Sequence, residues 1–343
     1  MSSIVPDLLY HLGGVPVGGL NDAGVGNVFW VVSSGSAADT LMATRNIGTE
    51  KIFTSIATAY AATTTKQNDV ILVTQGNYLE TATLDWSKDN VHLIGVGGPV
   101  SHSDWTLTGT TIYTTDTAID YVIDMSGERN TIRNVAINNY GANAACLSAV
   151  RVSGYGNGFF NSAFMGTMTA TQALTSGASS LDIAKGGHYL YFENCTIGQS
   201  EWGTRSSTTS GVLNFSGTSS PPPTHGHFKN CQFLSSAATA GVPMVYMASN
   251  QSCGRLWRFT NCLFYNFWAN WEGMCSSVFQ NPASGQSTCS MVLEGCTSVG
   301  YTEWQQREFA GTTYTNEGWV MSAMPLTATA GGLSKIPTGT VGA

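Results

Sequence analysis

The sequence predicts an all-β protein, a single-stranded right-handed parallel β-helix (solenoid) with a short N-terminal capping helix and extended terminal arms. Three observations lead to this prediction. A six-residue motif recurs along most of the chain, and its hydrophobic phase skips one position at the centre. Only 10% of the 343 residues are charged, and 39 are glycine, whereas soluble proteins carry about 25% charged residues. A charge-poor chain rich in small polar residues and β-formers suits a rigid β-rich body.

The recurring motif has a central asparagine or glycine between two short hydrophobic segments. It occupies residues 132–137, 159–164, 192–197, 228–233 and 259–264, with a looser copy at 293–298. The central residues are Asn134, Asn161, Asn194, Asn230, Asn261 and Gly295, spaced 27 to 36 residues apart. An earlier copy is expected around Gly95. Recurrence at this period is the sequence signature of stacked repeats.

The phase of the motif predicts its local structure. Apolar or small residues fall at positions −2, +1 and +3 relative to the central residue. A straight strand would place them at −2, 0 and +2, because successive side chains alternate between faces. A one-residue bend in the left-handed conformation, which Asn and Gly tolerate best, restores the inward phase. Each motif is therefore predicted to be strand, corner, strand, with asparagine side chains hydrogen-bonding from coil to coil.

Half of the eight cysteines directly follow a central residue. They are Cys195, Cys231, Cys262 and Cys296. On stacked coils we expect them to form an inward ladder of free thiols. Disulfides are the less favoured alternative, because equivalent positions on successive coils have parallel Cβ vectors. Cys146, Cys253, Cys275 and Cys289 lie outside the motif and are left without an interpretation. No C-x-x-C pair exists and the histidines do not cluster with cysteines, so no metal and no cofactor is expected.

The remaining elements divide the chain into three parts. Residues 1–46 are expected to form an N-terminal arm that leads into the cap, 47–310 the parallel β-helix, and 311–343 an extended C-terminal arm. Ile52, Ile56, Ala59 and Tyr60 recur at helical spacing, and residues 69–73 form a buried-strand pattern. The stretches 170–185 and 204–225, rich in Ser, Thr and Gly, are expected to be loops.

The N-terminal part of the β-helix carries a family resemblance. The residues concerned are GTEKIFTSIATA (48–59), DVILV (69–73), GNY (76–78) and NVHLIG (90–95). They resemble the opening of pectate-lyase-like β-helix proteins, in which the first segment is a short capping helix and the rest the first coil with a Pro-Gly-x-Tyr-like turn. Gln75 stands here in place of the usual proline. The resemblance covers about residues 47–300 and implies a fold rather than an activity, since many activities share this scaffold.

A short acidic run supplies the best candidates for catalysis. Carbohydrate-active β-helices use clustered carboxylates, in some cases with Ca²⁺, and Asp116, Asp120 and Asp124 are the densest acidic run. Their spacing of four does not by itself establish that they share one strand face. A solvated surface strand or turn is favoured over a calcium or catalytic site, and no catalytic residue is assigned.

Other polar and aromatic residues are open to a structural interpretation. Arg133, Glu193, Lys229 and Glu294 precede the corners and are expected to form a surface ladder of charges rather than a reactive site. His225-Gly-His227 is expected to belong to a proline-rich loop rather than to a metal site. Trp268, Trp271 and Trp304 are candidates for stacking on sugar rings or for a subunit interface, and the interface is slightly favoured.

Charge and hydropathy exclude several classes of partner. The chain has 14 Lys and Arg against 21 Asp and Glu, a net charge of −7, and no basic patch, so nucleic-acid binding is not expected. No apolar run approaches the roughly 18 residues of a membrane span, so no membrane contact is expected. The N-terminus lacks the pattern of a signal peptide, which predicts synthesis in the cytoplasm of a host cell.

These features together resemble decoration (cement) proteins and tailspikes of tailed bacteriophages. The resemblance implies a structural virion protein, most simply a homotrimeric capsid decoration protein that contacts the major capsid protein or other virion proteins. The alternative is a tailspike or other β-helix enzyme, a polysaccharide lyase or glycoside hydrolase, that binds and cleaves host surface glycan. A bacterial adhesin is a third and less favoured reading, because an export signal is missing.

Overall fold

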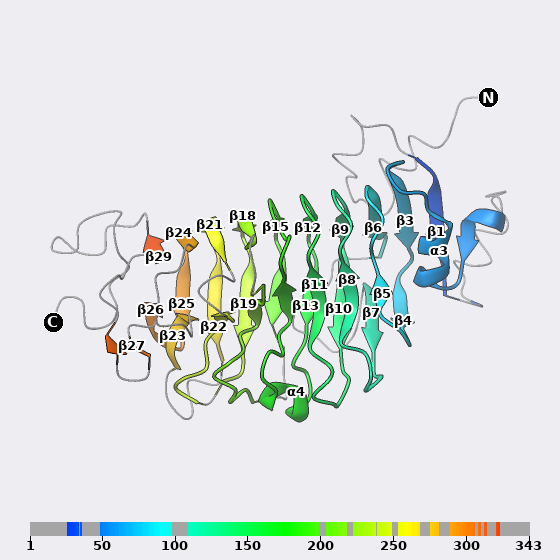
Figure 1. Cartoon of the computed structure of the whole chain (residues 1–343). Coiled ribbons are helices and arrows are strands. Elements are labelled where there is room, and N and C mark those ends of the chain that lie inside the picture. Colours follow the sequence, from blue (N-terminus) through cyan, green and yellow to red (C-terminus); the bar gives the residue numbers. More distant parts are fainter. Residues whose placement is uncertain are drawn as a thin grey trace.

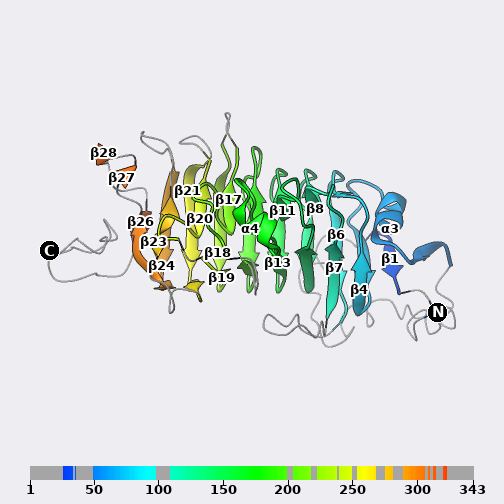
Figure 2. The same ribbon diagram turned by 90° about the horizontal axis from the view of Figure 1, so that it is seen from below.

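The computed structural model describes residues 26–33, 35, 49–97, 109–198, 204–217, 222–237, 239–248, 253–267, 275–280, 289–305, 308–309, 312–313 and 320–322. These residues form a right-handed parallel β-helix, as predicted. Its coils stack side by side along one axis, so that the molecule is an elongated rod (Figures 1 and 2). Each coil passes through three sheets, here named C, A and B in chain order, as β8 (Tyr121–Met125), β9 (Thr131–Arg133) and β10 (Val135–Asn139) do.

The three sheets run along the stack, and their strands pair in parallel with the preceding and following coil. Sheet A contains, in order, β2 (Ile52–Phe53), β1 (Val28–Val31), β3 (Asp69–Val73), β6 (Val91–Gly95), β9 (Thr131–Arg133), β12 (Gly158–Phe160), β15 (Tyr191–Glu193), β18 (Thr224–Lys229), β21 (Gly254–Thr260), β24 (Cys289–Glu294) and β29 (Val320–Ser322). Sheet B contains β4 (Gly76–Leu79), β7 (Thr110–Thr114), β10 (Val135–Asn139), β13 (Ala163–Met165), β16 (Thr196–Gly198), β19 (Gln232–Ser235), β22 (Leu263–Asn266) and β25 (Thr297–Val299). Sheet C contains β5 (Leu84–Asp85), β8 (Tyr121–Met125), β11 (Ser148–Val152), β14 (Leu181–Ile183), β17 (Leu213–Phe215), β20 (Val245–Met247), β23 (Cys275–Gln280) and β26 (Tyr301–Gln305).

The corner between sheets A and B has the predicted left-handed backbone. The five asparagines have φ between 48° and 56°, and Gly295 has φ 63°. Each asparagine N–H donates to the carbonyl that precedes the corner on the next coil, as Asn194 does to Lys229 at 3.0 Å. Two steps of the ladder also carry a side-chain hydrogen bond, from Asn194 to Asn161 at 3.2 Å and from Asn261 to Asn230 at 3.4 Å. The corner prediction is confirmed for these coils.

Gly95 differs from the later corners. The register pairs Leu93 with Ile132 and Ile94 with Arg133, which places Gly95 against Asn134. Gly95 nevertheless ends strand β6 and does not have a left-handed φ. A side chain there would collide with the Asn134 carbonyl, so the glycine allows close packing instead of a bend. Gly95 therefore occupies the predicted position in the stack, but the prediction that it forms a left-handed corner is wrong.

The four cysteines of the motif form the predicted ladder of free thiols. Each Sγ lies 3.3–3.6 Å from two carbonyl oxygens, one two residues earlier and one of a phenylalanine on the preceding coil. The neighbouring Cys231 thiol, together with burial, raises the pKa of Cys262 to about 12, and burial raises the pKa of Cys231. Cys146 and Cys275 are also buried free thiols, whereas Cys253 is disulfide-bonded.

The core consists of ladders of like side chains. Phe159, Phe192, Phe228 and Phe259 stack face to face on successive coils, with ring centroids 4.4–5.0 Å apart and interplanar angles of 5–12°. This separation matches the spacing of paired strands, about 4.8 Å. At one end of the stack α3 (Ile56–Ala62) buries Ile56 and Ala59 against the core, as the predicted capping helix should.

Some segments differ from their predicted structure. Ile52, expected in the capping helix, lies in β2, which follows the short 3₁₀ helix η2 (Thr49–Lys51). The expected loop 170–185 contains α4 (Ala170–Leu174) and β14, because Thr169 and Gln172 form a capping box that starts a helix. The expected loop 204–225 likewise contains β17.

Sheet A also includes strands outside residues 47–310. β1 lies between β2 and β3, and β29 pairs with β24. A separate antiparallel pair joins β27 (Glu308–Phe309) and β28 (Thr312–Thr313). The remainder of the two expected arms lies outside the described residues, and the boundaries of the three parts stay predictions.

Candidate active site on sheet C

The outer face of sheet C carries a column of polar residues. Strand pairing places Asp85, Asp124, Arg151, Asp182, Asn214, Tyr246 and Gln280 next to one another on successive coils. Alternation along each strand explains their direction, because neighbours such as Ile123, Val150 and Leu181 are fully buried in the core. The column brings together charged residues that are far apart in sequence.

Arg151 lies between two carboxylates at the centre of this column. Its Nη1 is 3.8 Å from Asp124 Oδ2, and its Nε is 3.8 Å from Asp182 Oδ2. Ser216 Oγ donates to Asp182 Oδ2 at 2.9 Å, and the guanidinium lies 5.2 Å from the centre of the Tyr121 ring. The two ion contacts are longer than hydrogen bonds, so the three charged groups hold one another by charge rather than by directed bonds.

The same residues keep unused hydrogen-bonding capacity. Asp124 Oδ1, Arg151 Nε and Asp182 Oδ1 are buried and make no hydrogen bond within the described part of the chain. Buried polar atoms are paired in the great majority of cases, so three orphans in one cluster call for an explanation such as a ligand or a reactive role. Arg151 and Asp124 keep 37% and 31% of their side chains exposed, while Asp182 keeps 7%. A ligand would therefore meet Arg151 and Asp124 first and Asp182 beneath them.

The local environment raises the pKa of both carboxyl groups. Burial raises the pKa of Asp182 to about 6, against the opposing effects of Ser216 and Arg151. Burial also raises the pKa of Asp124, which Arg151 lowers and Asp85 raises further. Burial and the nearby Asp182 raise the pKa of Tyr121 to about 12. An acid with a pKa near 6 exchanges protons near neutral pH, which is what acid–base catalysis requires.

Only one member of the predicted acidic run belongs to this cluster. Asp116 and Asp120 are exposed, Asp116 Oδ1 accepts from Ala118 N–H at 2.8 Å, and the Asp120 carbonyl accepts from the backbone of β11. Asp124 alone points into the column. Sequence reasoning missed Arg151 and Asp182, because no local motif marks them and only the strand register joins them to Asp124.

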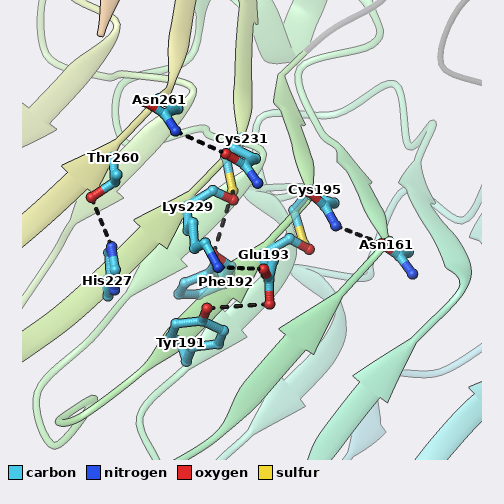
Figure 3. A network of polar contacts seen from close by, with 12 residues as sticks. Asn161, Tyr191, Phe192, Glu193, Cys195, His227, Lys229, Cys231, Thr260 and Asn261 are labelled. Carbon is cyan, nitrogen blue, oxygen red and sulfur yellow. Dashed lines mark hydrogen bonds and ion pairs between the residues drawn. The ribbon is translucent and has the colours of Figure 1, made fainter. Parts of the chain in front are cut away.

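The outer face of sheet A carries charged residues of the predicted ladder, of which Figure 3 shows Glu193 and Lys229. Glu193 accepts from Lys229 at 2.8 Å and from Tyr191 at 3.2 Å. On the following coils, Thr260 contacts both His227 at 3.0 Å and Glu294 at 3.2 Å. These side chains hydrogen-bond to one another from coil to coil, so their role on this face is well explained as structural.

The histidine pair and the tryptophans can now be placed. His225 and His227 lie in strand β18 rather than in a loop, and His225 stacks on Tyr189 with ring centroids 4.8 Å apart. Trp304 is half-buried against Phe264 at 5.7 Å. Trp268 and Trp271 lie outside the described residues. Among the described residues, no group of three or more His, Cys, Asp or Glu side chains could hold a metal ion.

Solved structures share the architecture. The pectate lyase Pel9A superposes with a TM-score of 0.53 and 13% identity, over 88% of this chain and 76% of its own. A pectin methylesterase from Aspergillus niger gives a TM-score of 0.46 and 14% identity, over 88% and 92%. A protein of Geobacillus virus E2, ORF18, gives only 0.26 at 14% identity, over 78% and 56%.

The likeness to the pectate lyase shows the fold alone, a pectate-lyase-like right-handed parallel β-helix. The sequence matches no protein-family model and no curated protein. Within the part of the chain that the structure describes, no helix is long and apolar enough to span a membrane.

Proposed function

We propose that this protein binds and cleaves a polysaccharide on the outer face of sheet C. The observation that carries the proposal is the cluster of Asp124, Arg151 and Asp182, in which two carboxyl groups flank one guanidinium and buried polar atoms remain unpaired. The accessible part of this face runs over Asp85, Asp124 and Arg151, so a chain substrate has room to lie across three coils there. The pectate lyase Pel9A, which shares this fold, acts by its name on pectate, and this favours a polysaccharide as the class of substrate.

The two carboxyl groups suit hydrolysis of a glycosidic bond. Asp124 and Asp182 lie two coils apart, so their backbones are about 10 Å apart. Side chains that project in parallel from two coils keep the backbone separation, which lies close to the upper end of the about 6.5–9.5 Å between the carboxyl groups of inverting glycosidases. Asp182, whose pKa is raised to about 6, would give its proton to the glycosidic oxygen as the C–O bond breaks. Asp124 would take a proton from the water that adds to the sugar carbon, and Arg151 would position both acids.

The test is turnover with matched variants. Purified protein is incubated with a panel of bacterial capsular polysaccharides and lipopolysaccharides, and new reducing ends are measured. Asp182→Asn and Asp124→Asn should each lower the rate by at least about 100-fold, the scale of a lost acid or base. Asp120→Asn changes an exposed carboxylate directly before β8 and outside the column, and it should retain the rate. Equal rates in all three variants would refute this site.

The second candidate is a structural virion protein of a tailed bacteriophage, a homotrimeric capsid decoration protein that contacts the major capsid protein. A charge content of 10% and exposed apolar side chains favour it, since Leu79 and Leu174 are 51% and 60% exposed. Imaging of virions with a labelled chain tests the location, and light scattering tests the trimer. Capsid binding without any glycan turnover would favour this candidate over the enzyme.

A further inference from the structure

A second column of left-handed corners runs along the rod, between sheets C and A. Strand register aligns Asn68, Asn90, Arg129, Gly156, Tyr189, His225 and Arg255 on consecutive coils. Their φ values lie between 51° and 69°. From Asn90 to Tyr189, each N–H donates to the carbonyl that precedes the column on the next coil, as Arg129 does to Tyr155 at 2.9 Å. The backbone requirement is thus the same as in the asparagine corner.

Four of the seven residues in this second column are neither glycine nor asparagine, the types that a left-handed backbone favours most. Glycine adopts a left-handed φ at little cost and asparagine is enriched there, and Gly156, Asn68 and Asn90 follow that preference. The column also contains Arg129, Tyr189, His225 and Arg255, for which a left-handed φ is uncommon and costs energy. Gly156 shows that a side chain is unnecessary for this corner, so the larger side chains need another explanation.

The side chains of Arg129, Tyr189, His225 and Arg255 form one stripe on the surface, together with Tyr155, which precedes Gly156. Tyr155 and Tyr189 are 39% and 51% exposed, their ring centroids are 5.1 Å apart, and Tyr189 stacks on His225 with an interplanar angle of 10°. Arg129 and Arg255 are exposed at either end of the aromatic stack. Within the described residues neither arginine forms an ion pair, unlike Lys229 and Arg258 on the adjacent face.

We propose that this stripe binds a linear anionic polysaccharide that runs along the rod. Arg129 and Arg255 are four coils apart, about 19 Å, so they would contact acidic groups on separate sugar units of one chain. Their planar guanidinium groups suit carboxylate and sulfate oxygens. The phenol and imidazole groups between them offer hydrogen bonds to sugar hydroxyls. The stripe lies along the starts of β9, β12, β15, β18 and β21, which stack side by side in Figure 1.

Charge favours this occupant over two others. A second copy of the chain that docked its own stripe here would bring arginines face to face, which like-charge repulsion opposes. A nucleic-acid duplex carries one charge per about 1.7 Å, a density that two arginines about 19 Å apart do not match. Glu128 is the acidic neighbour of Arg129, so the Arg255 end should contribute more to binding. The proposal does not rest on the cleavage proposed for sheet C.

The experiment measures affinity for three defined polymers: alginate, dextran sulfate and uncharged dextran. We expect binding of the two polyanions that weakens as salt rises, and none of dextran. The double variant Tyr189→Gly/Arg255→Gly keeps a left-handed corner and should bind alginate at least ten times more weakly. Lys66→Gly is the matched control, because Lys66 is an exposed cation with φ 66° outside the column, and it should bind within twofold of the parent.

The possible results separate the alternatives. Circular dichroism and thermal melting of the double variant establish that it is folded, and a single variant Arg255→Ser serves if it is not. Equal losses in the column variant and in Lys66→Gly would overturn the proposal, because the binding would follow net charge alone. Binding of dextran as tight as that of alginate would also overturn it, as would a stripe found covered in a dimer or trimer by cross-linking at Tyr189.

Discussion

At the residue scale, the asparagine corners depend on one backbone conformation and one amide. Asn194 has φ 55°, and its side chain donates to Asn161 at 3.2 Å. Asn194→Ala should lower the free energy of unfolding by about 2 kcal/mol, because alanine in a left-handed conformation costs about 1–2 kcal/mol and a hydrogen bond is lost. Asn194→Gly should cost about 1 kcal/mol or less. Denaturant unfolding measures both, and equal losses would show that the backbone conformation contributes nothing.

The raised pKa of Asp182 gives a prediction about pH and stability. Its folded pKa is about 6, whereas an unfolded aspartate has a pKa of about 3.9. The folded protein binds this proton more tightly, so stability falls as pH rises from about 4 to about 6 and stays lower above that range. Asp182→Asn removes the titration and can still bond Ser216.

At pH 8 the Asp182→Asn variant should therefore be more stable than the parent by up to about 3 kcal/mol, the equivalent of a two-unit shift. At pH 4 the two proteins should differ little. Thermal melting across this pH range checks the prediction, and Asp120→Asn serves as an exposed control. A variant that is less stable at pH 8 would mean that Arg151 stabilises the charged Asp182 more than burial destabilises it.

At the element scale, stability comes from like side chains stacked between coils. Phe228 stacks on Phe192 and Phe259 with centroids 4.4 Å and 5.0 Å away, and it also contacts Phe233 and Trp257. Phe228→Ala should cost about 3–5 kcal/mol, because it leaves a cavity in a closed stack. Phe228→Leu keeps most of the volume and should cost less than about 2 kcal/mol. Denaturant midpoints of the two variants give the comparison.

The elements also show how far the sequence could predict this fold. The asparagine corner was predictable, because Asn and Gly at a phase skip point to a left-handed bend. The second column was not, since Arg129, Tyr189 and His225 carry no such signal. The sheet C cluster was equally hidden. The coils differ in length, so that Asp124, Arg151 and Asp182 come together only through strand register. The short strand β14 was hidden because it has only three residues and directly follows Ser/Thr-rich sequence that is typical of a loop.

At the scale of the whole molecule, one hydrophobic core extends from Phe29 in the first coil to Tyr301 in the last described one. Each coil packs only against its two neighbours, so the ends of the stack are the surfaces at which the core would be open to water. The capping helix α3 covers one such end, at the first strands of sheet A. These strands are short, and α3 packs across them.

The capping helix α3 should therefore prevent end-to-end association of the rod. Ala59 is fully buried on the core side of α3, whereas Ala57 on the same helix is exposed. Ala59→Arg should lower the free energy of unfolding by about 3 kcal/mol, since it places a charge in the core. It should also displace the helix and open a sheet end to pairing with another chain. Light scattering should then detect end-to-end association that grows with concentration for Ala59→Arg and is unchanged from the parent for Ala57→Arg. If Ala59→Arg is destabilised and shows no added association, α3 contributes stability but does not protect the end of the stack.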